Sequence, residues 1–514
     1  MSHRIGHEMF GSARSAWGGM ILAASLPWAA LPLVAHAQET KVVVAQSADV
    51  PTLDPTATTS SLGINVYQNV FDHLTTIAAD GSVTPRLGEK WDIADKAKVW
   101  TFKIRNGVKF HDGSPLTVDD VIWTYQKVMA DAKSPVKPYL KMVKSIDKVG
   151  TDSVRFTLDE SFITFDRQVS LVSILPQKAY ERLGAEKFSL QPVGSGAFKV
   201  VQWVKDGYLE LAANPDFWGG APKVGKVVFR PVPSEPARAA GLASGELDIV
   251  PLLPPTLVAS LATRPNIKVE KVGSNRTIFL GYNPANPQLA NLKLRQAIDH
   301  AIDRDAIATK LLRGLGKPVG QIPAPVLFGY DPSVAPTRYD PELAKKLVAE
   351  SGYKGEKIVF QYPNNRWAFA EEVAQAVGGY LKTVGIQAEL QSMEFSAFFP
   401  LWLGNKLGSM YMFSLGITVM DADLILNLEY ESGSSHGYWV NAEVDALAKQ
   451  QRAETNPQVR KEILGRIWRM SQQNAWFAPL YQEIQAYGIS DRVKWAPRPD
   501  ERLNFENVEV VAKK

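Results

Sequence analysis

The stretch over residues 99–130, VWTFKIRNGVKFHDGSPLTVDDVIWTYQKVMA, constrains the fold of this chain more than any other segment. Its apolar residues Trp100, Phe102 and Ile104 alternate with polar ones, which predicts a strand with one buried face. Asn-Gly at 106–107 then predicts a two-residue turn, because these residues tolerate a positive φ. The order of strand, turn and helix indicates a fold of mixed α and β structure.

The second half of this stretch predicts a short strand and then a capped helix. Val108 and Phe110 form the expected strand. Thr117 is placed to cap a helix, and Asp120 completes an imperfect capping box, since Glu is preferred at that position. No catalytic arrangement occurs in the stretch, so we expect its charges on solvated surfaces.

The order RNGVKFHDG, LTVDDV and helix resembles the signature segment of the extracytoplasmic solute-binding proteins of peptide/nickel-type ABC importers, family 5. This family includes dipeptide-, oligopeptide- and glutathione-binding proteins. Two further segments carry the resemblance, residues 191–220 (QPVGSGAFKVVQWVKDGYLELAANPDFWGG) and 294–323, which open with LRQAIDHAIDRDAI. The resemblance implies an α/β, two-lobed periplasmic-binding-protein-like fold of class II, cluster C type, with an extra subdomain in the first lobe.

The resemblance also implies where the lobes begin and end. It places the lobe I core in residues 38–60, 181–275 and 490–514, the extra subdomain in 61–180, and lobe II in 276–489. Patterns outside the signature stretch alternate between strand and helix, as an α/β fold requires. The predicted helices are 65–73, 162–175, 235–245, 291–312 with Asp303 capping its continuation, 341–352, 367–384 and one opening at Pro457.

Composition excludes several functional classes. The 514 residues carry a net charge of +4, 45% hydrophobic and 21% charged residues, which is typical of a soluble globular protein without a nucleic-acid footprint. Cysteine is absent, so disulfides, Cys-ligated metals and a Cys nucleophile are impossible. The histidines are scattered and no HExxH motif occurs, so we expect no metal and no cofactor.

The first 37 residues predict a signal peptide. Arg4 and Arg14 precede an apolar run over residues 20–34, and Ala-His-Ala at 35–37 forms a cleavage site. An uncleaved membrane anchor is the alternative, which two prolines in the apolar run disfavour. Without a cysteine for lipidation, the predicted location is the periplasm, with cleavage near Ala37.

The resemblance points to Asp421 as the best ligand candidate, because an acidic residue in this segment pairs with the ligand's ammonium group in peptide-binding relatives. A carboxylate in a closed cleft forms a strong charge-assisted bond with an amine. Thr418 stands where some relatives carry another acid. Helix capping by Asp421 and Asp423 is the alternative interpretation.

A second group of candidates lies in the segment YPNNRW. Arg366 could hold a carboxylate through its bidentate fork, beside Tyr362 and Trp367. Trp439 could wall an apolar pocket together with Trp367, although aromatic residues at helical spacing also fit a core. The same two interpretations apply to Phe398, Phe399 and Trp402. The resemblance further implies that Thr59 and Ser60 approach the ligand from the first lobe, against a solvated loop.

Two short motifs allow other functions. Residues 433–437 match the G-x-S-x-G of serine hydrolases, with Ser435 as nucleophile, but residues 429–432 are poor strand material before such an elbow. The GSG at 194–196 could cradle a phosphate, but no Lys-Ser/Thr follows it, so a hairpin turn is favoured. A secreted hydrolase therefore stays as the alternative function, with a chaperone-like or haem/metal-chelate carrier as a third.

The sequence thus predicts a monomeric, non-enzymatic periplasmic component of an ABC importer. It would bind a small, peptide-like solute between two lobes and deliver it to the permease in the inner membrane. Closure would be a hinge motion stabilised by contacts that the solute makes only in the closed state.

Overall fold

The computed structural model of this protein describes residues 40–364, 366–434 and 436–511. These residues fall within a compact unit that begins at Thr40. The predicted signal peptide and its cleavage site lie outside the described residues. Among the described helices, none combines the length and the apolar character needed to cross a membrane.

The strands are spread over the whole described chain. They are β1 (Lys41–Gln46), β2 (Thr75–Ile77), β3 (Val83–Pro85), β4 (Gly88–Ala94), β5 (Val99–Ile104), β6 (Val143–Val149), β7 (Ser153–Leu158), β8 (Phe198–Val204), β9 (Tyr208–Ala213), β10 (Lys226–Pro231), β11 (Ile249–Val250), β12 (Ile267–Tyr282), β13 (Gly316–Pro318), β14 (Ile358–Pro363), β15 (Ala388–Met393), β16 (Met410–Gly416), β17 (Phe477–Ser490), β18 (Val493–Lys494) and β19 (Glu509–Val510).

The helices alternate with these strands, as α/β folds require. They are α1 (Ser61–Val70), α2 (Val118–Ala130), α3 (Phe165–Gln168), α4 (Gln177–Phe188), α5 (Glu235–Ser244), α6 (Pro255–Ala262), α7 (Pro287–Ala290), α8 (Leu292–Ala301), α9 (Arg304–Ala306), α10 (Pro341–Ser351), α11 (Ala370–Thr383), α12 (Phe395–Leu403), α13 (Asp423–Ile425), α14 (Ala442–Ala453) and α15 (Pro457–Gln473). Two 3₁₀ turns, η1 (Lys137–Leu140) and η2 (Val169–Leu171), and two π-helical turns, η3 (Ile307–Leu311) and η4 (Leu426–Tyr430), complete the set.

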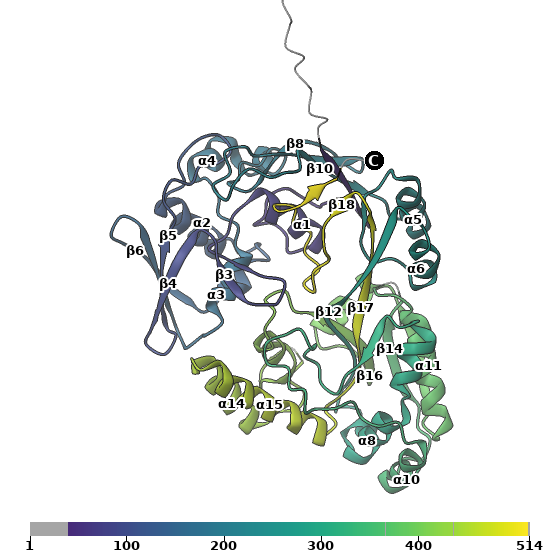
Figure 1. Cartoon of the computed structure of the whole chain (residues 1–514). Coiled ribbons are helices and arrows are strands. Elements are labelled where there is room, and N and C mark those ends of the chain that lie inside the picture. Colours follow the sequence, from purple (N-terminus) through teal and green to yellow (C-terminus); the bar gives the residue numbers. More distant parts are fainter. Residues whose placement is uncertain (1–39, 365, 435, 512–514) are drawn as a thin grey trace, which may run out of the picture. The chain divides into compact units, whose positions relative to one another are not determined.

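One mixed sheet runs through the molecule in the order β15-β14-β16-β12-β17-β11-β1-β10-β9-β8, with β13 attached to β17. The long antiparallel strands β12 and β17 occupy its middle, and Figure 1 shows them linking the β8 and β10 side to the β14 and β16 side. Their pairing shifts register between Gly273 and Thr277, opposite residues 482–484. Such an irregularity locally bends and twists a ladder.

The signature stretch forms part of a second, four-stranded sheet with the order β4-β5-β7-β6. Trp100, Phe102 and Ile104 of β5 are all buried, so the predicted one-sided strand is confirmed. The capping box of α2 is also confirmed: the Thr117 N–H donates to Asp120 Oδ2 at 2.9 Å, and the Asp120 N–H donates to the Thr117 hydroxyl. The predicted strand at 108–110 is wrong, because only an isolated bridge from Lys109 to Pro115 forms there.

The helix predicted over residues 162–175 is shorter than its apolar pattern indicated. Only α3 and the 3₁₀ turn η2 form, and the residues after them are extended and buried. Ser170 Oγ donates to the Arg167 carbonyl, and the Ser173 hydroxyl contacts the His73 ring. Serine side chains that bond locally or across the fold compete with a regular helix, and periodicity does not reveal this.

Of two other local predictions, one holds with a change of length and one does not. The helix expected over 291–312 breaks at Ile302, and Asp303 then caps the continuation by accepting the Ala306 N–H at 2.8 Å. The GSG segment packs closely on the end of α1, where a Cβ on Gly194 would lie 1.9 Å from the Val70 carbonyl oxygen. These glycines therefore have a packing role ahead of β8, and the hairpin turn predicted at this segment does not form.

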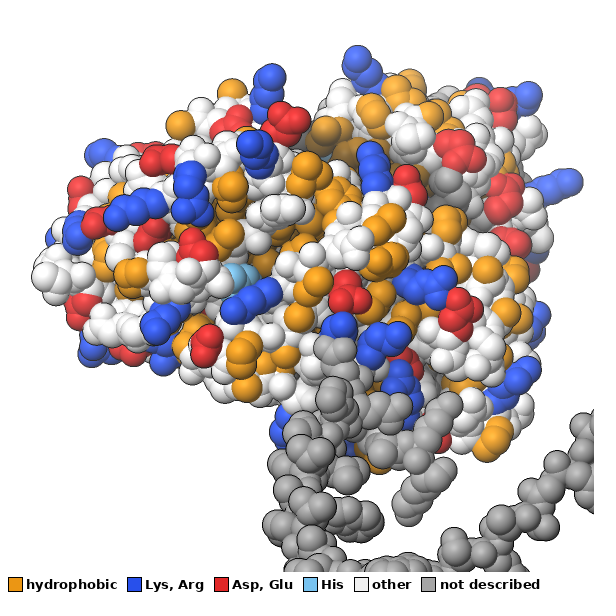
Figure 2. Space-filling view, turned by 90° about the horizontal axis from the view of Figure 1, so that it is seen from above, with side chains coloured by type: hydrophobic (Ala, Val, Ile, Leu, Met, Phe, Trp, Pro, Cys, Tyr) orange, Lys and Arg blue, Asp and Glu red, His pale blue; other side chains and the backbone are white. Residues whose placement is uncertain are grey.

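The charged side chains on the face shown in Figure 2 alternate in sign, without a broad area of either sign. This agrees with the near-neutral net charge of the sequence.

Candidate functional site

A cavity of about 840 Å³ lies beside the β12–β17 pair where the register shifts. We call it the cleft cavity. Arg276 from β12 and Glu483 and Gln485 from β17 reach it, while Arg366 and Trp367 reach it from the segment before α11. Its volume falls within the range of about 300–1,000 Å³ that is typical of small-molecule sites.

The wall of the cleft cavity carries a hydrogen-bonded charge network. Arg276 Nε pairs with Glu501 Oε1 at 2.7 Å, and the Gln485 amide donates to both Glu501 and Glu483 at 2.9 Å. Burial and the neighbouring Glu501 raise the pKa of the Glu483 carboxyl, whereas Arg276 holds the pKa of Glu501 below its usual value against the effect of burial. Of these two carboxylates, Glu483 is therefore the one whose ionised form still lacks a compensating positive charge, which a cationic group of a ligand could supply.

Arg366 lines the cleft cavity, and its guanidinium N–H groups have no hydrogen-bond acceptor among the described residues. Within the described residues its guanidinium makes no hydrogen bond or ion pair, and its contact is with the ring of Phe395, 5.2 Å from the centroid. The guanidinium is exposed, so water satisfies it in the absence of a ligand. A planar guanidinium can donate two parallel hydrogen bonds to one carboxylate.

Several polar atoms that line the cleft cavity are buried and lack a hydrogen-bond partner among the described residues. They are Asn364 Oδ1, Trp367 Nε1, Ser414 Oγ and Tyr481 OH. Buried polar atoms are satisfied in most proteins, and exceptions call for a missing water or ligand. The set offers one acceptor, one donor and two hydroxyls.

Backbone strain also gathers at this cavity. Leu252, Phe369 and Glu501 all line it, and all three have a positive φ, between 54° and 64°. Non-glycine residues pay an energetic cost in this conformation and tend to occur at binding sites.

The predicted ligand residue Asp421 lies fully buried, with arginine partners inside the protein. Arg460 donates to both of its oxygens at 2.6 and 2.7 Å, and Arg167 Nε lies 3.5 Å away. Arg460 thereby keeps the pKa of Asp421 low, although burial would raise it. Asp423 is likewise buried and accepts from Arg452 Nε at 2.7 Å. Ligand contact by either residue stays a prediction, and both carboxylates are occupied in this conformation.

The other predicted residues fall into three places. Arg366 and Trp367 line the cleft cavity, whereas Thr59 and Thr418 line a smaller cavity of about 50 Å³ together with Tyr139 and Ser173. Ser60 precedes α1 and its N–H donates to the Thr58 hydroxyl. Thr59 and Thr418 are thus brought together across a long sequence separation.

Tyr362 and Trp439 are held by internal contacts. The buried Tyr362 hydroxyl donates to Glu371 at 2.8 Å. Trp439 Nε1 donates to the Trp476 carbonyl, and its ring carries the Arg295 guanidinium at 4.1 Å. Phe398 and Trp402 belong to a hydrophobic core cluster, while Phe399 is exposed.

Sequence reasoning missed the acidic and amide side chains of the cleft cavity. Glu483 and Gln485 interrupt the mostly apolar strand β17, so a search for polar residues within buried strands could have found them. Arg276 follows the polar first half of β12 and carries no such signal. Glu501 lies in a polar loop and carries no such signal. Its place at the cavity comes from the tertiary fold alone.

The hydrolase motif at 433–437 centres on Ser435, which lies outside the described residues. The π-helical turn η4 precedes the motif, where a nucleophile elbow requires a strand. The neighbouring His436 stacks on Trp402 with ring centroids 3.9 Å apart. Among the described residues, no group of His, Cys, Asp and Glu is arranged to hold a metal ion.

The chain is similar to several known proteins, both in sequence and in fold. The chain is 26% identical over 478 residues to the dipeptide-binding protein of Escherichia coli K12, covering 83% of this chain and 86% of that protein. Its fold matches HbpA2 from Haemophilus parasuis with a TM-score of 0.83, at 23% identity and over 92% of this chain and all of that one. It also matches AppA from Bacillus subtilis, solved with a nonapeptide, with a TM-score of 0.77, at 23% identity and over 92% of this chain and 99% of that one.

The predicted two-lobed α/β architecture is therefore confirmed at the level of the fold. Residues 82–436 match the family model for the bacterial extracellular solute-binding proteins, family 5 (middle region). This match spans more than half of the chain and includes the signature stretch. The protein thus belongs to the family 5 bacterial extracellular solute-binding proteins.

Proposed function

We propose that this protein binds a peptide-like solute in the cleft cavity and delivers it to the permease of an ABC importer. The observation that carries the proposal is the unpaired guanidinium of Arg366, which faces the same cavity as the half-buried carboxylate of Glu483. A zwitterionic solute could place its carboxylate on Arg366 and its ammonium group near Glu483. The dipeptide-binding relative and the nonapeptide in AppA support a peptide as the solute class.

The proposal includes no chemical step on the solute. The context of G-x-S-x-G differs from a nucleophile elbow, which supports a binding role over the hydrolase alternative. Recovery of an intact peptide by mass spectrometry after long incubation is the result expected; accumulation of its fragments would favour the hydrolase.

We further propose that the chain acts as a periplasmic monomer after cleavage near Ala37. The extracellular family and the A-x-A pattern support the location. For the lobes we keep the sequence-based boundaries of 38–60, 181–275 and 490–514 against 276–489. The register shift of the β12–β17 pair at residues 273–277 supports a hinge where the chain passes from proposed lobe I to lobe II, between residues 275 and 276.

The test compares two forms of one peptide. Di- to nonapeptides are first screened by their effect on the melting temperature. The best binder is then titrated calorimetrically with its free C-terminal carboxylate and as its C-terminal amide. We expect Arg366→Gln to weaken binding of the free acid about tenfold to a hundredfold and to leave the amide nearly unchanged, because only the acid uses the guanidinium.

The matched control is Arg182→Gln on α4, an exposed arginine that does not line the cleft cavity. It should bind both peptide forms as the unaltered protein does. Equal affinity of Arg366→Gln and the unaltered protein for the free acid would contradict the proposed site.

A further inference from the structure

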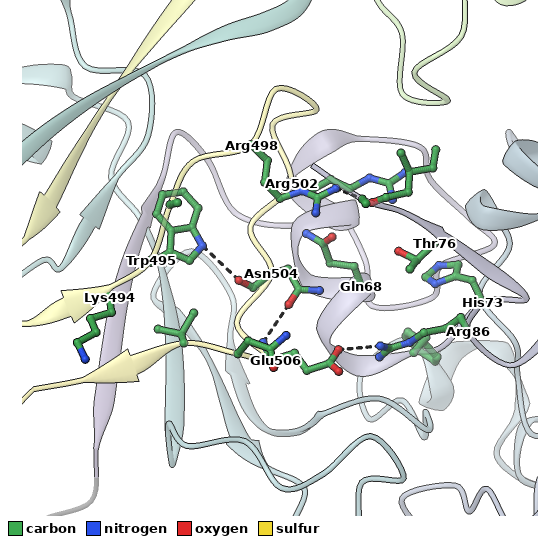
Figure 3. A pocket seen from close by; sticks show the side chains of 16 residues that line it. Gln68, His73, Thr76, Arg86, Lys494, Trp495, Arg498, Arg502, Asn504 and Glu506 are labelled. Atoms are coloured by element: carbon green, nitrogen blue, oxygen red, sulfur yellow. Dashed lines mark hydrogen bonds and ion pairs between the residues drawn. The ribbon is translucent and has the colours of Figure 1, made fainter. Parts of the chain in front are cut away.

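A second cavity, of about 380 Å³, lies between the C-terminal segment and residues 68–86. We call it the C-terminal cavity; it shares no lining residue with the cleft cavity. Figure 3 shows its charged lining, which is rich in cations. The charged side chains that line it are Arg86, Lys494, Arg498, Arg502 and Glu506.

All but one of these cations have an anionic partner within hydrogen-bond distance. The pairs are Arg86 with Asp72 and Glu506, Arg498 with Asp500, and Lys494 with Glu509, at 2.6–3.1 Å. Their charges are therefore neutralised inside the protein.

Arg502 is the exception. Its residue is 7% exposed, yet its guanidinium donates no hydrogen bond to any described residue. The nearest carboxylate oxygen is Asp500 Oδ2, 3.6 Å from Arg502 Nε, and both oxygens of Asp500 already accept from Arg498. An arginine stays charged in proteins, and Arg502 lines the C-terminal cavity, so its free donors are available to bind an anion there.

Gln68 adds a second free donor at the same place. Its Nε2 atom is buried and has no partner among the described residues. Gln68, His73 and Arg502 line both the C-terminal cavity and the small cavity that holds Thr59 and Thr418. Burial, together with Arg502 and Arg86, lowers the pKa of His73 to about 3. This ring is therefore neutral at neutral pH and adds no positive charge to the cavity.

We propose that Arg502 and Gln68 form an anion-binding site for an oxyanion, either a carboxylate or a phosphate group. The guanidinium can donate two parallel hydrogen bonds to such a group, and the Gln68 amide a third. The oxyanion is either a free ion or an acidic group carried by a bound solute. This anion-binding site uses other residues and another cavity than the proposed peptide contacts of Arg366.

The test uses inorganic phosphate as the probe. The melting temperature of the full secreted protein is followed against phosphate concentration, with chloride holding the ionic strength constant. We expect a saturating rise for the unaltered protein, because phosphate binds the folded state. Arg502→Gln should weaken the apparent phosphate affinity at least about tenfold, and Gln68→Met should weaken it less.

Phosphate also stabilises proteins non-specifically, through exclusion from their surface. That effect does not saturate and does not depend on Arg502. Arg182→Gln, the exposed control, should keep the saturating response. A response of equal size and shape in the unaltered protein, Arg502→Gln and Gln68→Met would overturn the proposal, and Gln68→Met decides alone if Arg502→Gln does not fold.

A second arm distinguishes the two sources of the anion. The peptides Ala-Glu and Ala-Gln are titrated in the presence and absence of phosphate. Competition between phosphate and Ala-Glu, lost in Arg502→Gln, assigns the site to an acidic group of the solute; phosphate binding that neither peptide alters assigns it to a free ion. Loss of the phosphate response leaves the Arg366 test untouched, so the two proposals fail separately.

Discussion

Glu429 is an acidic residue with unfavourable surroundings. It is fully buried, and neither carboxylate oxygen has a hydrogen-bond partner among the described residues. Burial raises the pKa of Glu429 to about 8. The negative charge of an ionised Glu429 would help to raise the pKa of three neighbouring tyrosines, Tyr411, Tyr430 and Tyr438. The side chain is therefore protonated in the folded protein at neutral pH.

This pKa predicts a loss of stability with rising pH. Between the usual Glu value of about 4.3 and the folded value of about 8, the folded state holds a proton that the unfolded state has lost. The free energy of unfolding should thus be highest below pH 4 for this group and fall across that window, by at most on the order of 5 kcal/mol. Glu429→Gln should flatten the fall, as measured by urea unfolding from pH 5 to 8.

The exposed Glu462→Gln on α15 is the control and should keep the original slope. An unchanged slope in Glu429→Gln would mean that this carboxyl is ionised in the folded state.

The pair of Asp421 and Arg460 gives a second prediction at the residue scale. Asp421→Asn leaves the buried Arg460 without its bidentate partner, so the free energy of unfolding should fall by about 3–5 kcal/mol. Adding Arg460→Met should recover part of the loss, because it removes the charge that was left alone. Chemical denaturation measures both. A loss in Asp421→Asn below about 1 kcal/mol would show that other groups satisfy Arg460.

At the scale of elements, the capping box of α2 is the clearest case of local sequence deciding structure. Thr117→Ala removes one acceptor and should lower the free energy of unfolding by about 1 kcal/mol. Thr151→Ala, at an exposed turn position, serves as the control and should have almost no effect. Equal losses in the two variants, measured by urea unfolding, would assign the effect to something other than the cap.

The elements also show which local features the sequence pattern predicts and which it does not. Asp303 caps its helix as predicted, and Asp340 and Asn456 cap α10 and α15, because a cap depends on residues within one turn. The segment after α3 departs from its predicted helix, because Ser170 and Ser173 bond elsewhere. The β12 strand begins at Ile267, well before its apolar run over residues 278–282, since its pairing with β17 extends it.

At the scale of the whole molecule, we expect the two lobes to approach each other when a solute binds. Contacts between the proposed lobes already exist at one edge, where Arg167 Nη1 donates to the Val419 carbonyl at 2.9 Å and the Ile163 N–H donates to the Arg452 carbonyl. A solute that binds both lobes shifts the population toward the closed state.

The absence of cysteine makes this closure measurable. Lys187→Cys on α4 and Lys345→Cys on α10 place one spin label in each proposed lobe of a chain with no other thiol. The best binding peptide should shorten or narrow the distance distribution between these labels. Lys345→Cys with Lys382→Cys, both in proposed lobe II, should stay unchanged. An unaltered distance in the first pair would contradict hinge closure.

The sequence by itself determined the family and part of the local structure. The strand at 99–104, the α2 cap and the signature motifs could be read directly, because each depends on residues that are close in the chain. Of the candidate site, it found Arg366 and Trp367. Only the tertiary structure decided that Glu483 and Glu501 face the same cavity and that Asp421 is paired with arginine side chains inside the protein. It also decided that Arg502 lacks a hydrogen-bonded partner among the described residues. Charge pairing across hundreds of residues depends on packing, which no local pattern encodes.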